Sequence, residues 1–309
     1  MRYSRKDREI FPKEKKRKKI KPQKLLIITT GGTIASTDTE EKGLAPTQNG
    51  LDFIPVVGDA EIYILDLYGI DSTDMSPAHW KLLYDAVTKN LPKYDGIVIL
   101  HGTDTMAYTG AVLAFTVNTD KPVILTGSML PSGASDSDAP DNILFACENA
   151  LNKNNRGVWL AFHDRLIGGA DIHKINSSEK DAFRRYSGFK VSRTLPFPEK
   201  PEAFPAVVKL SPFMSGDDLR RSADGHKSVI IETYGAGGLP AGEITDTVRE
   251  LAKKARVTIT TPCIGGTNLD RYEAGRRALD AGAVSGGMMS TECAAVYEWI
   301  TGNNSSRHI

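Results

Sequence analysis

Cysteine is scarce in this chain of 309 residues, and the three that occur, Cys147, Cys263 and Cys293, lie far apart and form no CxxC pair. Their odd number and wide spacing argue against a disulfide framework and against a cysteine-ligated zinc site. Apolar runs of transmembrane length are missing, and the N-terminus lacks the apolar core of a secretory signal. We therefore expect a cytoplasmic protein with no membrane partner.

Several well-known catalytic motifs are missing as well. The 6 histidines, at positions 79, 101, 163, 173, 226 and 308, show no HExxH-like spacing. No Walker loop and no GxGxxG follows an expected strand, and the GxSxG of the common serine hydrolases does not occur. The sequence thus predicts no metal site and no cofactor, and it leaves nucleophilic chemistry by a hydroxyl group open.

The charge is distributed unevenly along the chain. Residues 1–24 carry a net charge of +9, and the total of +1 therefore leaves −8 for the rest. Residues 1–23 lack the apolar content to pack, so we expect a disordered basic arm. Such an arm could contact RNA or a membrane surface, but a basic run alone favours a solvated tail over either of these.

Apolar runs alternate with polar segments and helical patterns from residue 24 onward. The runs that read as buried strands are 25–29, 62–67, 96–100, 121–126 and 158–162. The segments that read as helices begin at Ser76-Pro77 and cover 107–116 and 141–152. This rhythm is typical of an α/β fold, here a larger N-terminal domain with a mostly parallel sheet flanked by helices.

A second, smaller α/β domain is expected at the C-terminus. Its expected elements are strands 228–233 and 256–261 and helices 245–254, 270–281 and 290–301. Residues 187–206 hold four prolines without periodicity, which is typical of a linker. The predicted division is thus an arm (1–23), an N-terminal domain (24–186), a linker (187–206) and a C-terminal domain (207–309).

Hydroxyl side chains follow three of the expected strands. They are Thr33 after the Gly31-Gly32 pair, then Ser72 and Thr73, then Thr103 and Thr105 beside Asp104. Ligands bind at the carboxyl ends of strands in open parallel sheets, so chemistry is expected there. A threonine hydroxyl needs an adjacent base, which a desolvated lysine can provide. Structural roles remain open, because Thr33 can cap a helix, and so can the Thr103-Asp104 pair.

Three segments give these hydroxyls a family context: Thr30-Gly31-Gly32-Thr33-Ile34-Ala35, His101-Gly102-Thr103-Asp104-Thr105-Met106 and Asp171-Ile172-His173-Lys174. They resemble the signature segments of bacterial-type L-asparaginases. Residues 71–75 (DSTDM), 125–128 (LTGS) and 234–237 (YGAG) are similar to the cytoplasmic, type I branch of that family. The resemblance extends in order from Lys24 nearly to the C-terminus.

The resemblance implies hydrolysis of L-asparagine to L-aspartate and ammonia through a threonine-linked acyl-enzyme, with L-glutamine as a second substrate. Thr33 would be the nucleophile, and Lys174 the base to the Thr103 hydroxyl in a group completed by Asp104. The residues implied in substrate binding are Gly32, Asp71, Ser72, Thr73, Asp104 and Ser128. The resemblance also implies a homodimer or homotetramer, in which the small domain of a neighbouring copy completes the site.

Two positions depart from the family pattern. Many members carry a tyrosine in the lid loop, for which residues 37–50 are expected here, and Leu44 occupies its place. The proton acceptor for Thr33 is therefore unassigned. Pro262 stands where a glutamine is frequent. His101, although inside a signature segment, is expected to be a satisfied core histidine without a catalytic role.

Two other functions remain open at this stage. One is the ammonia-generating, asparaginase-like subunit of a tRNA-dependent amidotransferase, which shares these motifs but normally carries an extra N-terminal domain. The other is a catalytically inactive amino-acid-binding protein, which the missing lid tyrosine favours and the presence of Thr33, Thr103, Asp104 and Lys174 disfavours.

Overall fold

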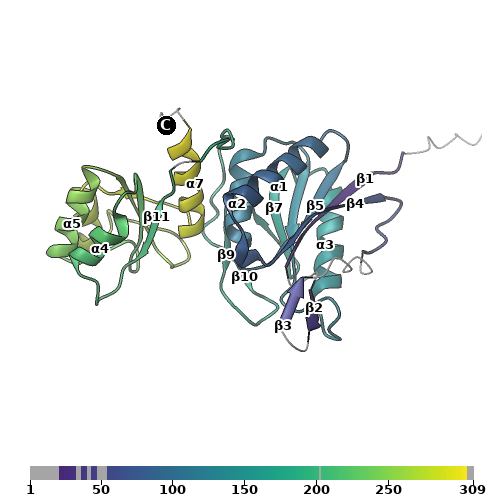
Figure 1. Ribbon diagram of the computed structural model, residues 1–309, viewed down its shortest axis with the longest axis horizontal. Coiled ribbons are helices and arrows are strands. Elements are labelled where there is room, and N and C mark those ends of the chain that lie inside the picture. The colour runs from purple at the N-terminus through teal and green to yellow at the C-terminus, as the bar shows by residue number, and fades with distance from the viewer. Residues whose placement is uncertain (1–20, 33–35, 40–42, 47–53, 202, 305–309) are drawn as a thin grey trace, which may run out of the picture.

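The computed structural model describes residues 21–32, 36–39, 43–46, 54–201 and 203–304. Its larger sheet has six strands in the order β4-β1-β5-β6-β7-β8 (Figure 1). They are β1 (Lys24–Gly31), β4 (Glu61–Ile70), β5 (Gly96–Leu100), β6 (Pro122–Thr126), β7 (Gly157–Phe162) and β8 (Arg165–Gly168). All neighbours pair in parallel except β8, which runs antiparallel to β7. The mostly parallel sheet is as the sequence predicts.

Helices cover both faces of this sheet, which explains why its central strands are continuous apolar runs. Leu26 and Ile97 point to one face, where they pack with α1 (Pro77–Asn90) and α2 (Met106–Thr116). Leu25 and Val98 point to the other face, where they pack against α3 (Ala139–Leu151). Every residue of β5 and β6 is buried.

The smaller sheet has four parallel strands in the order β11-β12-β13-β14. They are β11 (Ala206–Lys209), β12 (Ser228–Glu232), β13 (Arg256–Thr260) and β14 (Val284–Ser285). Its helices are α4 (Gly216–Ala223), α5 (Glu243–Ala252), α6 (Glu273–Asp280) and α7 (Thr291–Asn303). The first three pack on one face of the sheet, and α7 lies on the other.

Helix α7 belongs to both halves of the molecule, and Figure 1 shows it between the two sheets. Toward the smaller sheet, buried Glu298 accepts hydrogen bonds from Arg256 (2.7 Å) and Thr258 (3.0 Å) of β13. Toward the larger sheet, Trp299 packs against Trp80 of α1, with ring centroids 5.5 Å apart, and against Phe197. Helix α7 is thereby packed against both domains.

Several elements differ from the sequence-based expectation. The region expected as a lid loop, 37–50, contains an antiparallel pair, β2 (Ser36–Thr39) and β3 (Gly43–Pro46). A second antiparallel pair, β9 (Ile172–Lys174) with β10 (Phe183–Arg185), was not expected, and neither were β8, β11, α4 and β14. These elements are short, with two to four residues in each strand and eight in α4, so hydrophobic periodicity alone cannot detect them.

The domain boundaries given above remain predictions, and most of the basic arm (1–23) lies outside the described residues. No helix in the part of the chain that the structure describes is long and apolar enough to cross a bilayer.

Candidate active site

Three loops meet at the carboxyl edge of the larger sheet, where β1, β4 and β5 end. Gly31 and Gly32 have φ angles of +94° and +84°, which side-chain-bearing residues rarely adopt. A Cβ atom on Gly32 would lie 2.4 Å from the Cα of Gly102, and one on Gly102 would lie 2.6 Å from Ser72 Oγ. The absence of side chains at both glycines lets the loops after β1, β4 and β5 pack in direct contact.

Lys174 joins the loop after β5 from a distant part of the chain. Its Nζ donates to Thr103 Oγ1 at 2.8 Å and to Asp104 Oδ1 at 2.6 Å. Thr103 is buried, the Lys174 side chain is 20% exposed, and the Asp104 side chain is 58% exposed. Lys174 ends β9 and pairs with Phe183 of β10, so the hairpin fixes the direction from which its ammonium group approaches. The structure thus brings together the three residues that the sequence predicts as one group.

Ser72 and Asp71 lie at the end of β4, beside this group. Ser72 is buried, its Oγ accepts the Asp104 N–H at 3.3 Å, and its carbonyl accepts the Thr105 hydroxyl at 2.8 Å. Asp71 is exposed and caps a short 3₁₀ turn, Ser72–Asp74. Its Oδ1 accepts both the N–H (2.8 Å) and the hydroxyl (2.9 Å) of Thr73. The Asp71 carboxylate is therefore exposed to solvent beside the Thr103–Lys174 group, and the Thr73 hydroxyl orients it.

Ser128 has a different environment from that of the other predicted residues. It is 1% exposed, and its Oγ donates to the carbonyl of Leu130 at 2.6 Å. Within the described residues no hydrogen bond joins it to Thr103, Asp104 or Lys174. Its loop is nevertheless next to the site, because a Cβ atom on Gly127 would lie 2.4 Å from the carbonyl oxygen of His101.

Asp138 and Asn142 hold that loop, and sequence reasoning missed them. The buried Asp138 carboxylate accepts the N–H groups of Met129 and Leu130, each at 3.1 Å, and the Asn142 amide at 2.9 Å. Asn142 also donates to the carbonyl of Gly127 at 3.0 Å. The sequence did contain a signal for this role, which was an Asp and an Asn spaced four residues apart at the start of a helix.

His101 is a satisfied core histidine, as the sequence predicts. Its Nδ1 lies 2.6 Å from the carbonyl of Gly102, and its Nε2 lies 3.0 Å from Thr109 Oγ1. Thr109 Oγ1 also accepts the indole N–H of Trp80 at 3.0 Å. Complete burial lowers the pKa of His101 to about 4, so the ring is neutral near pH 7 and donates from Nδ1.

Helix α2 corrects one expectation about this segment. Its N-cap is Thr105, with no side-chain capping bond, so Thr103 and Asp104 do not cap it.

Tyr68, a tyrosine near the candidate active site, points away from that site. The Tyr68 hydroxyl donates to the carbonyl of His79 in α1, and burial raises the pKa of the Tyr68 phenol well above its usual value.

Thr33 and the Leu44 side chain lie outside the described residues, so the structure does not place them. Main-chain pairing puts Leu44 opposite Asp38 in the β2–β3 hairpin. Among the described residues, no three His, Cys, Asp or Glu side chains are grouped so that they could hold a metal ion.

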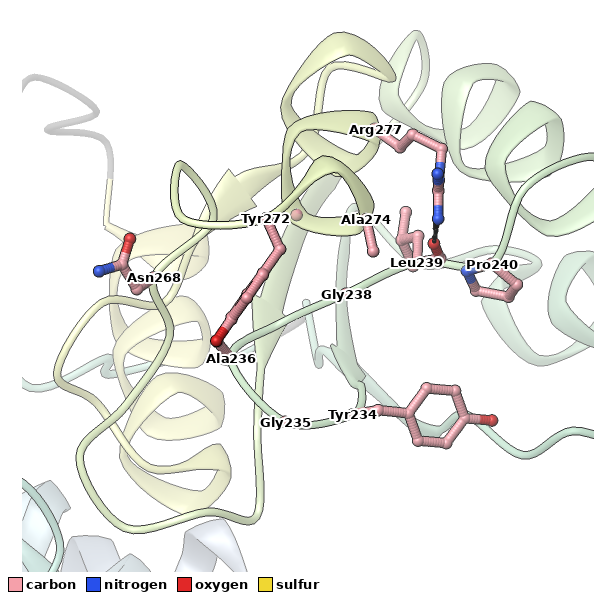
Figure 2. A pocket seen from close by; sticks show the side chains of 11 residues that line it. Tyr234, Gly235, Ala236, Gly238, Leu239, Pro240, Asn268, Tyr272, Ala274 and Arg277 are labelled. Atoms are coloured by element: carbon pink, nitrogen blue, oxygen red, sulfur yellow. Dashed lines mark hydrogen bonds between the residues drawn. The ribbon is translucent and has the colours of Figure 1, made fainter.

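A cavity of about 420 Å³ opens on the smaller domain, next to the end of β12 (Figure 2). Figure 2 shows Tyr272 reaching toward Ala236 and Arg277 standing over Leu239, whose carbonyl accepts two hydrogen bonds from the guanidinium. Its lining brings together no nucleophile and base, in contrast to the group around Thr103.

Models of known families match most of this chain. The model described as "Asparaginase, N-terminal" matches residues 24–194, and the "Glutaminase/Asparaginase C-terminal domain" matches residues 206–305. The chain belongs to the asparaginase family. The two matched segments contain the larger and the smaller sheet respectively.

Individual relatives agree with this assignment. A protein named L-asparaginase from Thermococcus kodakarensis is 37% identical over 296 residues, which is 87% of this chain and 89% of the relative. The solved structure titled "The thermostable L-asparaginase from Thermococcus kodakarensis" superposes with a TM-score of 0.81 at 34% identity, covering 92% of this chain and 94% of the other. A subunit of the Glutamyl-tRNA(Gln) amidotransferase from Archaeoglobus fulgidus is 31% identical over 314 residues, covering 90% of this chain and 75% of the relative.

Proposed function

We propose that this protein hydrolyses the side-chain amide of L-asparagine to L-aspartate and ammonia. The observation that carries the proposal is the contact of Lys174 with Thr103 and Asp104 at the edge where the Gly31-Gly32 turn packs against Gly102. Family membership and the 37% identity to a protein named L-asparaginase support the same reaction.

In the proposed mechanism Thr33 attacks the amide carbon of the substrate. Its hydroxyl proton passes to an acceptor that we leave unassigned, since Leu44 holds the place of the lid tyrosine. The C–N bond then breaks, ammonia leaves with a proton, and an ester joins the aspartyl group to Thr33. Water hydrolyses this ester in the second half of the reaction. Backbone N–H groups that follow the His101-Gly102 turn would stabilise the negative oxygen in both halves.

In its neutral amine form, the Lys174 side chain would serve as base to the Thr103 hydroxyl. The two groups are in hydrogen-bond contact at 2.8 Å, the distance that proton transfer requires. Asp104, whose carboxylate lies 2.6 Å from the same nitrogen, would hold Lys174 in place and face the α-ammonium group of the substrate. Thr103 would then take a proton from the attacking water, or give one to the leaving ammonia, next to Thr33.

The remaining residues would bind the amino-acid end of the substrate. Asp71 offers a solvent-exposed carboxylate, oriented by Thr73, to the α-ammonium group. Ser72 and Gly32 would bind the α-carboxylate, and Ser128 would shape the wall of the pocket. L-Glutamine, one methylene longer, is proposed as a weaker substrate, because one methylene is worth about 1–3 kcal/mol of discrimination.

Ammonia release from L-asparagine and from L-glutamine tests the proposal, with Thr33→Ala as the inactivating variant. Thr88→Ala is the matched control, because Thr88 sits on α1 and its hydroxyl bonds only to main-chain carbonyls of its own helix. We expect activity in the wild type and in Thr88→Ala and none in Thr33→Ala. A folded wild type that binds either amide without releasing ammonia would instead support an inactive binding protein.

A second candidate function is supply of ammonia within a tRNA-dependent amidotransferase. The 31% identity to the amidotransferase relative over 90% of this chain favours it. In that case amide hydrolysis would depend on a partner protein and on tRNA, whereas the first function requires neither. Contact with RNA through residues 1–23 belongs to this second function and is tested by deleting the arm.

We also propose a homodimer or homotetramer in the cytoplasm. The three cysteines are free, which suits a reducing compartment. Tyr234 and Tyr272, 43% and 55% exposed, line the largely apolar cavity of Figure 2 and offer a contact surface to a second copy. A mass measurement by light scattering, repeated on a Tyr234→Ser/Tyr272→Ser double variant, tests whether this face joins the copies.

A further inference from the structure

A second cavity, of about 720 Å³, lies on the larger domain. Five segments form its walls: the C-terminal end of α2, the start of β7, the turn after β8, the end of β10 and residues 188–194. None of the residues that are assigned to amide hydrolysis and described by the structure lines it. The cavity is therefore separate from the proposed catalytic edge, and nothing in the proposed function uses it.

The side chains around this cavity are unusually rich in positive charge. Among the described residues, four cations line it, Arg156, Arg185, Lys190 and Arg193, against a single carboxylate, Asp171. They come from the turn before β7, from β10 and from the segment between the domains, so the fold gathers them from separate parts of the sequence. This concentration of positive charge contrasts with the net charge of −8 that the chain carries outside residues 1–24.

The one carboxylate does not neutralise this group. Asp171 is buried, and its oxygens accept the N–H groups of Ser187 at 2.9 Å and of Gly188 at 2.8 Å. Of the four cations only Arg185 approaches it, with Nε 3.5 Å from Oδ2. Arg156, Lys190 and Arg193 form no ion pair with any residue that the structure describes.

We propose that this cavity binds a small phosphate-bearing anion of about nucleotide size. Guanidinium groups recognise phosphate oxygens in pairs of parallel hydrogen bonds, and three of the four cations are arginines. A concave surface lined by charges of one sign concentrates multivalent ions of the opposite sign. The volume lies in the range of about 300–1,000 Å³ that is usual for small-ligand sites.

Two aromatic residues give the cavity a surface that inorganic phosphate alone would not need. Trp159 and Phe189 are half-buried in its wall, and Phe189 packs against Phe115 of α2 with ring centroids 6.2 Å apart. Flat apolar surfaces beside arginines suit a ligand that joins phosphate groups to a planar ring, as a nucleotide does.

The cavity also adjoins the hairpin that carries Lys174. Arg185, at its wall, pairs with Ile172 in the β9–β10 ladder, and Lys174 pairs with Phe183 two residues further along. An anion that holds Arg185 would thus stabilise the hairpin. Binding itself does not depend on the proposed hydrolysis, so the two proposals can fail separately.

Calorimetric titration of the full-length protein with Mg²⁺-free ATP and with inorganic pyrophosphate tests the site. The disabling variant is Arg156→Gln/Arg193→Gln, and the control is Lys253→Gln/Lys254→Gln, which removes the same charge at the end of α5 on the other domain. We expect saturable binding to the wild type, about tenfold or more weaker in the disabling variant and unchanged in the control. If ATP binds more tightly than pyrophosphate, the additional affinity comes from the aromatic wall. If the two ligands bind with the same affinity, the phosphate groups alone are recognised.

The proposal would be overturned if the wild type, the disabling variant and the control variant bound the anion with the same affinity. The basic arm, which is present in all three proteins, would then account for the binding. Absence of saturable binding to the wild type at low salt would overturn the proposal as well. Hydrogen exchange of the wild type gives a readout that needs no variant. ATP should slow exchange in residues 186–194, and unchanged exchange there contradicts the site.

Discussion

Lys174 is the residue on which the proposed chemistry depends most directly. Its ammonium group makes two short contacts, with Thr103 and with Asp104, from a strand that lies seventy-one residues further along the chain than Thr103. Methionine has a similar length and no proton to exchange. In Lys174→Met we expect kcat for asparagine to fall by about 10²–10⁴-fold, the usual loss for a general base.

A KM that changes much less than kcat would identify the role of Lys174 as chemical. The matched control is Lys180→Met, because Lys180 lies in the connection that follows Lys174, between β9 and β10, and bonds to Asp136 on the surface. Unchanged kcat in Lys174→Met would remove Lys174 from the mechanism and leave its contact with Thr103 as a structural one.

His101 provides a prediction about stability and pH. Burial lowers its pKa to about 4 in the folded chain, against about 6.5 in the unfolded chain. Between these values only the unfolded chain binds the proton, so the free energy of unfolding rises with pH across that window and levels off above it. The shift corresponds to about 3 kcal/mol.

Urea unfolding of the wild type and of His101→Asn at pH values above and below this window measures the effect. On acidification, we expect the free energy of unfolding of the wild type to fall by about 3 kcal/mol more than that of the variant, because the asparagine side chain binds no proton. Nitrogen NMR of the imidazole at neutral pH gives a check that needs no variant. A charged ring there would contradict the assignment of Nδ1 as the donor to Gly102.

At the scale of elements, the strands that organise the site could be predicted from the sequence. Residues 25–29, 96–100 and 121–126 are apolar because helices cover both faces of the sheet, and β1, β5 and β6 form there. The polar segments after β1 and β5 then had to meet at one edge. The Thr103–Lys174 contact could not be obtained this way, because it depends on the short β9–β10 hairpin.

Helix α4 is a different kind of omission, since its signal was present. Ser215 accepts the N–H of Asp218 at 3.1 Å, and Asp218 accepts the N–H of Ser215 at 3.0 Å, which is a capping box. The Ser-x-x-Asp spacing is visible in the sequence. The helix is only eight residues long and mostly polar, however, so its hydrophobic pattern covers only about two turns. Local capping chemistry would have located it where hydrophobic pattern did not.

The loop after β6 gives a prediction at this scale. The Asp138 carboxylate accepts two loop N–H groups, from Met129 and Leu130. An asparagine there can accept through only one oxygen, and its amide would face a donor. In Asp138→Asn we expect a loss of about 1–3 kcal/mol in the free energy of unfolding. Asp141→Asn, exposed in the same helical turn, should cost less than about 1 kcal/mol.

Urea unfolding of the two variants measures these losses. A higher KM for asparagine in Asp138→Asn would show that the loop also shapes the substrate pocket. Equal stability of Asp138→Asn and Asp141→Asn would mean that the loop holds its conformation without the carboxylate, and that the buried hydrogen bonds contribute nothing net.

At the scale of the molecule, α7 makes the two domains one unit. Glu298 binds it to the smaller sheet, and Trp299, one residue later, packs against Trp80 on the larger domain and against Phe197 of the segment between the domains. A helix that belongs to both cores should make both unfold together. We therefore expect a single calorimetric transition for the wild type, although the chain has two sheets, each with a hydrophobic core.

Trp299 allows that coupling to be tested with a matched pair of variants. Trp299→Ala removes the aromatic contact between the domains, and we expect it to cost about 3–5 kcal/mol and to separate the unfolding of the two domains into two transitions. Trp299→Phe keeps an aromatic ring at this position. The indole nitrogen of Trp299 is buried without a hydrogen-bond partner among the described residues. Phenylalanine removes this unsatisfied polar group, which offsets part of the stability that the smaller ring loses. Trp299→Phe should therefore keep one transition close to that of the wild type. Two transitions in the wild type itself, or one in Trp299→Ala at an unchanged temperature, would show that α7 does not couple the domains.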